Sequence, residues 1–265
     1  IAKTSLSVPG KRTHFAMASL GGGKALLFGG RKQSTPTTVL SDTWMLDLSA
    51  SGGTWAQLGG VAPAGRYYHA MAMLGNNLSL LYGGSPQSGP DLSDTWVFDL
   101  NQVGKYWTEV KAEELSVLPA LVLPAMAPLE NNCVLLLGSP VSIASINSRI
   151  FNNTNKKWTE VPAEQQDQYP PTSTSGPLKS LVAVGRGQAI TVTQPSTSTG
   201  QLYPDVWYFN NGVWNYSHTP EDSLFIRTAG TQNSNQQLPL LPLFTNSSNP
   251  RVLMFDVSGV SGVDS

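Results

Sequence analysis

The side chains best suited to metal binding or redox chemistry are three histidines and one cysteine. His14 and His69 lie near the starts of two similar segments but one position out of step, and His218 has no second histidine near it. Metal sites need converging ligands. Cys133 is the first residue of the apolar run Cys-Val-Leu-Leu-Leu, and in such a strand a cysteine usually acts as a small hydrophobic side chain. We therefore predict no metal site, no cofactor and no catalytic residue, and a protein that is not an enzyme.

A glycine run and four recurring carboxylates are the other groups that could do chemistry. Gly21-Gly-Gly-Lys24 is similar to a phosphate-binding loop, but no Ser or Thr follows the lysine, and an apolar strand follows in place of a helix. Asp42, Asp47, Asp94 and Asp99 recur in register, which favours a structural role. We expect a hairpin turn at the glycines, and we expect the aspartates to accept hydrogen bonds from loop and turn backbone donors.

Four Asn-x-Ser/Thr sequons are candidates for N-linked glycosylation: Asn77, Asn152, Asn215 and Asn246. All four fall in expected turns, strand ends or loops, where a bulky glycan can be accommodated. Ser/Thr-rich stretches at 171–175 and 195–199 offer sites for O-linked sugar or form flexible loops. These features favour a secreted or cell-surface protein, with a cytoplasmic location as the alternative.

Composition excludes several classes of partner. Charged residues make up 12% of the 265 residues, and 16 Lys and Arg nearly balance 17 Asp and Glu, so no strong field recruits nucleic acid or an anionic membrane. The most apolar segment, 117–129, is broken by prolines and is too short to span a bilayer. The single cysteine rules out an internal disulfide, and the start at Ile1 indicates a processed form, a fragment or an incomplete chain.

Two long stretches of the sequence recur almost unchanged. LSDTWMLDL at 40–48 returns as LSDTWVFDL at 92–100, and the segment 12–21 returns at 66–75. Between them, Leu-Leu-Phe-Gly-Gly matches Leu-Leu-Tyr-Gly-Gly. Two weaker copies follow, and tryptophans close the four copies at positions 55, 107, 158 and 214. One supersecondary unit of about fifty residues is therefore repeated along the chain.

Each unit is predicted to form four short strands, here called a to d. Strand a alternates small and large apolar residues, strand b ends at Gly-Gly, strand c begins with Asp-Thr-Trp, and strand d carries the closing tryptophan. Turns rich in Gly and Asn join a to b. Such a unit cannot bury both faces alone, but units packed face to face around an axis can. The prediction is an all-β propeller of four-stranded antiparallel blades, with small residues of strand a innermost and tryptophans between the blades.

An Arg-containing start, a strand ending in Gly-Gly, an Asp-x-Trp strand and a closing Trp together resemble the kelch repeat. The first two units carry every element, the third has Leu121 and Asn147 in place of Arg and Asp, and the fourth keeps Asp205, Trp207 and Trp214. The resemblance implies a kelch-type propeller. It implies little about activity, because one fold hosts many functions.

We predict that residues 1–265 form a single domain of five blades. The approximate blades are 12–60, 66–112, 121–162, 176–217 and 224–257, the last completed by a strand from 1–5. Such a swapped strand would tie the termini together and leave no free sheet edge. The alternative is that 252–255 forms a strand b of a larger propeller.

In a propeller, the b–c loops and d–a links share one end of the blades. The b–c loops are long and varied here, so we expect a protein or glycan partner to bind at this loop face. The candidate binding residues are Arg31, Lys32, Gln33, Tyr67, Tyr68, Gln87, Asp91 and Tyr203.

Three hypotheses about function follow from the sequence. The first is a non-enzymatic kelch propeller that is secreted or at the cell surface, is glycosylated, and serves in binding or in extracellular structure, including self-association into an extracellular assembly. The second is an intracellular kelch substrate adaptor or scaffold. The third is an enzyme similar to galactose oxidase, whose copper is held by His and Tyr side chains with a Tyr–Cys cross-link. The position of Cys133 does not support that chemistry.

Overall fold

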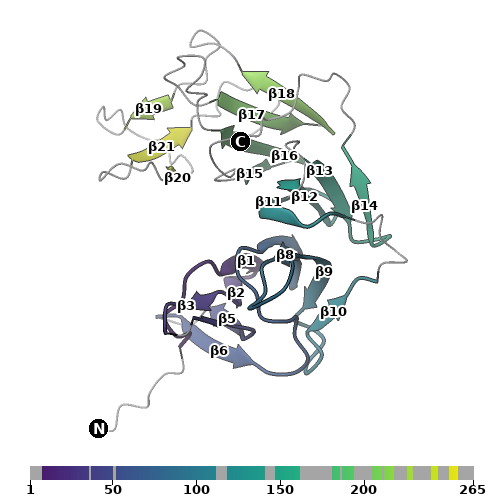
Figure 1. Cartoon of the computed structure of the whole chain (residues 1–265). Coiled ribbons are helices and arrows are strands. Elements are labelled where there is room, and N and C mark those ends of the chain that lie inside the picture. Colours follow the sequence, from purple (N-terminus) through teal and green to yellow (C-terminus); the bar gives the residue numbers. More distant parts are fainter. Residues whose placement is uncertain are drawn as a thin grey trace. The chain divides into compact units, whose positions relative to one another are not determined.

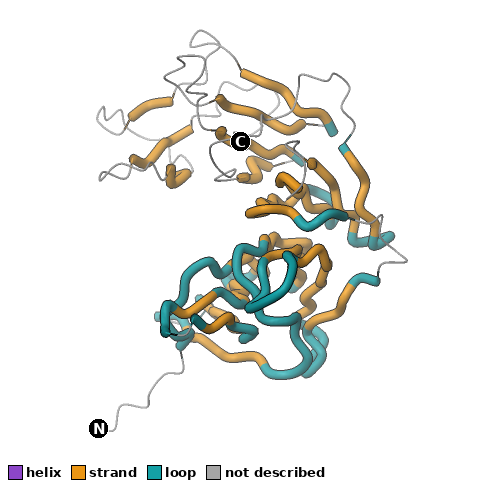
Figure 2. The backbone as a smooth tube through the Cα atoms, viewed as in Figure 1, coloured by secondary structure: helices purple, strands orange, loops and turns teal. Residues whose placement is uncertain are grey.

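The computed structural model describes a chain of strands and loops (Figure 2). The described residues are 8–35, 37–49, 52–111, 118–140, 147–161, 181–185, 187–193, 205–210, 212–217, 226–228, 240–243 and 251–255. They fall into two compact units, Ile1–Asn215 and Tyr216–Ser265. No helix in the described part is long and apolar enough to cross a membrane.

The first unit contains four sheets, each a four-stranded antiparallel meander (Figure 1). This confirms the predicted four-stranded antiparallel blades. Blade 1 consists of β1 (Ala16–Gly21), β2 (Lys24–Phe28), β5 (Thr43–Asp47) and β6 (Thr54–Leu58), and blade 2 of β7 (Ala70–Gly75), β8 (Leu78–Gly84), β9 (Leu92–Asp99) and β10 (Trp107–Glu109). Blade 3 consists of β11 (Leu121–Pro128), β12 (Cys133–Pro140), β13 (Asn147–Asn152) and β14 (Lys157–Glu160). Blade 4 consists of β15 (Leu181–Gly185), β16 (Gln188–Thr193), β17 (Asp205–Asn210) and β18 (Val213–Ser217).

The predicted a–b turns are formed as expected. Gly22 and Gly23, between β1 and β2, have φ of 57° and 73°, and Asn77, between β7 and β8, has φ of 64°. Only glycine, and asparagine to a lesser degree, adopts this left-handed conformation readily. The glycine run is therefore a hairpin turn. A small extra hairpin, β3 (Arg31–Lys32) with β4 (Thr38–Val39), lies inside the first b–c loop.

Neighbouring blades pack through opposite faces of their sheets. Between blades 1 and 2 a buried cluster joins side chains of strands a to d: Ala18, Leu20, Leu26 and Phe28 from blade 1, and Met71, Leu81, Phe98 and Trp107 from blade 2. A second cluster joins blades 2 and 3 in the same manner. Burial of this apolar surface is the main force that holds one blade against the next.

The closing tryptophans lock each blade to the one before it. Nε1 of Trp107 donates to Oγ1 of Thr43 over 3.0 Å. Trp158 donates to Thr95 over 3.1 Å, and Trp214 donates to Ser148 over 2.9 Å. The acceptor is the residue after the Asp position of strand c in the preceding blade. These tryptophans are 2–4% exposed, which confirms their predicted place between blades.

The face of blade 1 that points away from blade 2 has no neighbouring blade packed on it among the described residues. Phe15 and Met17 are 41% and 42% exposed, whereas Met71, the counterpart of Met17 in blade 2, is 7% exposed. Trp55 is likewise only partly buried. The face of blade 1 that would receive a preceding blade is thus apolar and uncovered in the described part of the chain.

The second unit contains a three-stranded antiparallel sheet of β19 (Ile226–Thr228), β20 (Leu240–Leu243) and β21 (Arg251–Phe255). These strands lie within the segment 224–257, which is predicted to form most of a fifth blade. Their spatial order is β19-β21-β20, which differs from the a-b-c order of the four blades. The proposed strand at 1–5 lies outside the described residues, so the closed five-blade ring stays a prediction.

Candidate binding site on the loop face

Each of the first two blades contains a buried arginine bonded to the Asp-x-Trp strand. In blade 1, Nη1 of Arg12 donates to the Gly29 carbonyl at 3.0 Å, and both terminal nitrogens bond the Asp42 carboxylate at 2.6 and 2.8 Å. Nε1 of Trp44 donates to the same carboxylate at 2.6 Å. This group of residues explains why Arg, Gly-Gly, Asp and Trp recur together in the sequence.

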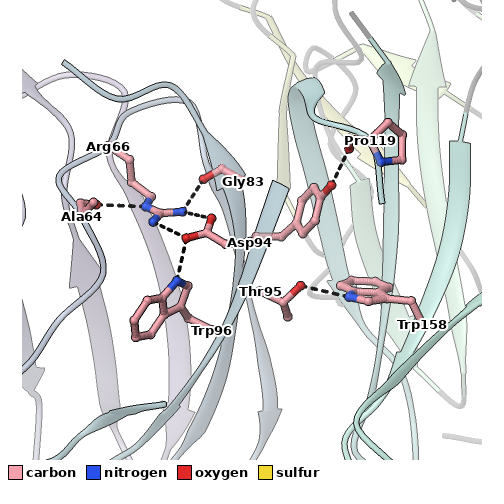
Figure 3. Close-up of polar contacts among 9 residues, drawn as sticks. Ala64, Arg66, Gly83, Asp94, Thr95, Trp96, Pro119 and Trp158 are labelled. Carbon is pink, nitrogen blue, oxygen red and sulfur yellow. Dashed lines mark hydrogen bonds and ion pairs between the residues drawn. The ribbon is translucent and has the colours of Figure 1, made fainter. Parts of the chain in front are cut away.

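Blade 2 repeats the arrangement (Figure 3). Arg66 is fully buried and donates to the Gly83 carbonyl and to both oxygens of Asp94, the latter at 2.5 and 2.7 Å. Trp96 donates to Asp94 at 2.7 Å. Burial alone would raise the pKa of Asp94, but the hydrogen bonds and charge of Arg66, with the Trp96 bond, outweigh it and hold that pKa below its usual value.

The main chain of Arg66 also holds blade 1. Its carbonyl accepts a hydrogen bond from the Gly30 amide at 2.8 Å, and its own amide donates to the Leu40 carbonyl at 3.2 Å. A Cβ on Gly29 would lie 2.6 Å from that Arg66 carbonyl oxygen, closer than real Cβ atoms approach any neighbour. The Gly-Gly pair is therefore needed because the next blade's arginine passes directly over it.

In blade 3 an apolar side chain occupies the position that the buried arginine has in blades 1 and 2. Leu121 takes the place of the arginine and is 3% exposed. It lies against Gly138, where a Cβ would be 3.0 Å from the leucine Cδ1. An unpaired aspartate here would be costly to bury. Blade 3 lacks both members of the pair, with Asn147 in place of the aspartate.

The predicted role of the recurring aspartates is half right. Asp47 and Asp99 accept hydrogen bonds at 2.9 Å from the backbone amides two residues further on, those of Ser49 and Asn101. Asp42 and Asp94 instead bind arginine and tryptophan side chains. The prediction missed this because each Arg–Asp pair spans about thirty residues of sequence and becomes visible only when the strands are paired.

His69 is enclosed between blades 1 and 2 and has no catalytic geometry. It is 6% exposed, and its ring packs edge-on against Phe28 with centroids 5.6 Å apart. Burial, with the Arg66 charge, lowers its pKa to about 3, although the Phe28 backbone and Asp94 act in the opposite direction. His69 is therefore neutral at physiological pH. His14 lies elsewhere, beside Tyr68. In the described residues, no three His, Cys, Asp or Glu side chains are grouped so as to hold a metal ion.

The loop face of blades 1 and 2 carries a cluster of one cation and three rings. Arg31 Cζ lies 5.0 Å from the centroid of the Tyr67 ring and 5.8 Å from that of Tyr68. The two tyrosine rings are 4.9 Å apart, and His14 packs edge-on to Tyr68 at 4.2 Å. We call His14, Arg31, Tyr67 and Tyr68 the Arg31 cluster. Three of its members are among the predicted binding residues, and the structure brings them together.

Backbone pairing fixes every member of the Arg31 cluster. Arg31 exchanges hydrogen bonds with Thr13 at 2.9 and 3.0 Å and pairs with Val39 on its other side. Tyr67 exchanges two hydrogen bonds with Ser85. The Tyr68 amide donates to the His14 carbonyl at 3.1 Å, and these two residues, equivalent in the repeat, have φ of 59° and 55°. Non-glycine residues held in this region often mark functional sites.

Of the other predicted loop-face residues, some are exposed and others form hydrogen bonds within the loops. Lys32 and Gln33 are exposed. Gln87 bridges the two b–c loops: its Oε1 accepts from the Val39 amide at 2.8 Å and its Nε2 donates to the Thr37 carbonyl at 3.0 Å. Asp91 accepts from the Ser85 hydroxyl at 2.6 Å. Tyr203 lies outside the described residues. His14 was missed, and its equivalence to Tyr68 in the repeat was the signal that could have found it.

Two sequons are placed in described turns at the opposite end of the strands. Asn77 lies in the β7–β8 turn, and its Nδ2 bonds Asn101 at 3.3 Å. Asn152 ends β13, pairs with Cys133, and accepts from the Thr154 amide at 2.8 Å. Both are partly exposed. The backbone of Asn215 lies in β18, and Asn246 lies outside the described residues. Glycosylation at all four sites stays a prediction.

Comparison with known proteins decides the family. Residues 1–185 match the KLHDC2/KLHL20/DRC7 Kelch-repeats domain. The chain belongs to this kelch-repeat family. Adagio-like protein 1 of Oryza sativa subsp. japonica is 34% identical over 109 residues, and Adagio protein 3 of Arabidopsis thaliana is 30% identical over 109 residues. Each match covers 41% of this chain but only 17% of the relative, so the chain spans a small part of the length of these relatives.

A solved structure supports the fold. The kelch chain aligns with the structure of YjhT at a TM-score of 0.52 and 10% identity, covering 81% of this chain and 67% of the other. At such low identity the likeness concerns the fold alone. Together with the four-stranded blades, it confirms the predicted kelch-type propeller class, and membership of the family supports a protein-binding module.

The buried arginine of this kelch chain can be tested by a double-mutant cycle. We expect Arg66→Leu to lower the free energy of unfolding by about 3–5 kcal/mol, because Asp94 is left partly buried without its partner. Adding Asp94→Asn reproduces the pair of residues found in blade 3 and should restore part of that loss. Urea unfolding measures both. A double variant no more stable than Arg66→Leu would show that the ion pair is not what holds the site.

Proposed function

We propose that this chain is a protein-binding module, not an enzyme, and that its partner binds at the loop face over the Arg31 cluster. The observation that carries this proposal is the cluster itself: a cation and three rings, held by backbone pairing and partly exposed. Tyrosine and arginine are enriched among the residues that contribute most to protein interfaces. Rigid aromatic side chains lose little conformational entropy on binding.

Among the described residues, several groups that could support catalysis are engaged in structural contacts. Asp42 and Asp94 are bound by arginines, and His69 is sealed between two blades. The thiol of Cys133 donates to the Asn131 carbonyl at 3.6 Å, and partial burial raises its pKa, which disfavours the reactive thiolate. These observations support binding over an enzymatic role, including one similar to galactose oxidase.

We further propose that the module acts outside the cell or at its surface. Support comes from the sequons at Asn77, in the β7–β8 turn, and at Asn152, which ends β13 before a turn; both asparagines are partly exposed. Both turns are at the a–b end of the blades, whereas the Arg31 cluster is at the b–c end. Glycans there would leave the proposed binding face open.

Site-specific photocrosslinking tests where the partner binds. A benzophenone amino acid placed at Gln33, which is exposed beside the Arg31 cluster, should crosslink a discrete partner in an extract of the natural source. The same group at Lys105, exposed at the opposite end of blade 2, should not. Tyr67→Ala should remove the Gln33 adduct, and Lys105→Gln should preserve it. Equal adducts from both positions, or none from Gln33, would refute binding at the loop face.

Mass spectrometry tests the proposed location. Protein from its natural source should show excess mass on peptides containing Asn77 and Asn152, and N-glycosidase should remove that mass while converting each asparagine to aspartate. If both asparagines are bare, the secretory proposal loses its support, and the intracellular adaptor hypothesis becomes the better account.

A further inference from the structure

We propose that the contact between blades 1 and 2 is sensitive to acid, because protonation of His69 opens the two blades and disassembles the Arg31 cluster. A partner bound at the loop face would then leave faster at mildly acid pH. The faster release rests on the proposed function, whereas the opening of the blades does not. The inference follows from the position of His69, from the groups around its ring, and from the hydrogen bonds that cross the contact beside it.

His69 occupies a position at which the repeat also accepts an apolar ring. The two copies of the repeat align His69 of blade 2 with Phe15 of blade 1. The structure agrees, since a Cβ on Gly84 would lie 2.8 Å from the Cβ of His69, and a Cβ on Gly30 would lie 2.9 Å from the Cβ of Phe15. His69 is 6% exposed and Phe15 is 41% exposed. A titratable ring is therefore enclosed where the fold does not require one.

The surroundings of His69 suit a neutral ring and not a charged one. Neither ring nitrogen forms a hydrogen bond with a described residue, and the ring packs edge-on against Phe28. The nearby Arg66 charge disfavours a second cation, and Asp94, which favours one, is already bonded to Arg66. Protonation would bury a positive charge whose N–H donors lack acceptors, which is costly.

The blade 1 side of the contact offers little compensation for a charge on His69. Phe28 and Gly29 lie against the ring, and a Cβ on Gly29 would be 3.2 Å from the His69 Cε1. The charged groups beside Gly29 are Arg12 and Asp42, which are bonded to each other. A protonated His69 would therefore be relieved by separation of the blades, which admits water to the ring.

The sign and the pH window of the effect follow from linkage. Burial and the Arg66 charge lower the pKa of His69 from 6.5 to about 3, so the open state binds a proton at a pH where the closed state does not. The closed contact is fully stable above pH 6.5 and is weakened as the pH falls toward 3. Burial alone would raise the pKa values of Asp42 and Asp94, but their arginine bonds hold them below the ordinary 3.8. Both aspartates therefore stay ionised at pH 5.

The hydrogen bonds beside His69 connect it to the Arg31 cluster. Tyr68, which immediately precedes His69, donates its amide to the His14 carbonyl at 3.1 Å. The Arg66 carbonyl accepts from the Gly30 amide at 2.8 Å. Both bonds join blade 1 to the link that enters blade 2. Separation of the blades would break them and move the two tyrosines of the cluster away from its arginine.

Native-state hydrogen exchange measured by NMR tests the acid-driven opening. Protection factors of the Gly30, Arg66 and Tyr68 amides, which bond across the contact, should fall about 30-fold between pH 7.5 and pH 5. This is the gain in proton binding by an open state whose histidine has the ordinary pKa of 6.5. His69→Phe, the residue that the repeat has in blade 1, should remove most of the fall. Constant protection in the unmodified chain, or an equal fall in His69→Phe, would overturn the inference.

The other histidines provide the control. The pKa of His14 is also lowered, first by burial and then by the Arg31 charge, so His14→Gln is measured by exchange alongside. It should keep most of the fall in protection, and its loss in this variant would show that His69 is not the group responsible. His218 lies outside the described residues and is present in every variant. If His69→Phe already lowers protection at pH 7.5, His69→Leu takes its place in the comparison.

Timed photocrosslinking tests the faster release. The immobilised chain with the benzophenone amino acid at Gln33 is loaded from the extract at pH 7.5, washed at pH 7.5 or pH 5, and irradiated after increasing times. The adduct should decay up to about 30-fold faster at pH 5, and His69→Phe should abolish the difference. Equal decay at the two pH values would overturn the release. Absence of an adduct at both pH values would refute the proposed function, while the exchange experiment still decides the opening.

Discussion

Arg66 is the residue on which two blades depend at once. Its main chain is hydrogen-bonded to the Gly30 amide and the Leu40 carbonyl of blade 1. Its side chain is bonded to the Gly83 carbonyl and the Asp94 carboxylate of blade 2. Burying a full positive charge is tolerated only where every donor has an acceptor and the countercharge is close. Each guanidinium nitrogen of Arg66 has an acceptor, and Asp94 supplies the countercharge. The side chain therefore requires Gly83 and Asp94 in blade 2, and the main chain requires the Gly29-Gly30 pair in blade 1.

This constraint also determines where binding chemistry can lie. In blades 1 and 2 the arginine, aspartate and tryptophan of the repeat are bonded to one another, so the proposed partner site uses residues that the repeat does not need. Arg31 and Tyr67 are of this kind: they follow the Gly-Gly pair and the buried arginine, respectively. Their backbones are held by hydrogen bonds to Thr13 and Ser85.

Much of the fold could be predicted from the sequence, because Gly-Gly, Asp-x-Trp and the closing Trp recur at regular positions along the chain and so mark the strands and turns of the repeat. The partners of Asp42 and Asp94, and the hydroxyl acceptors of Trp107 and Trp158, could not, since these contacts join strands or blades far apart in sequence. The pattern predicted Arg31, Tyr67 and Tyr68 as binding residues of one face, and the structure brings them together, while binding at that face stays a prediction. It could not show that Gln87 braces two loops, nor that His14 joins the cluster. The strand order in the C-terminal unit likewise follows no repeated motif.

Blades 1 and 2 are coupled through the hydrogen bonds and close contacts of Arg66 with the Gly29-Gly30 pair. Native-state hydrogen exchange of Gly29→Ala measures this most directly, since the added Cβ would meet the Arg66 carbonyl at 2.6 Å and Gly29 has a φ of 63°. We expect amides in β8 and β9 to lose protection together with those in β2, because the clash moves Arg66 away from the Gly29-Gly30 pair. Loss confined to β2, with β8 and β9 fully protected, would contradict it.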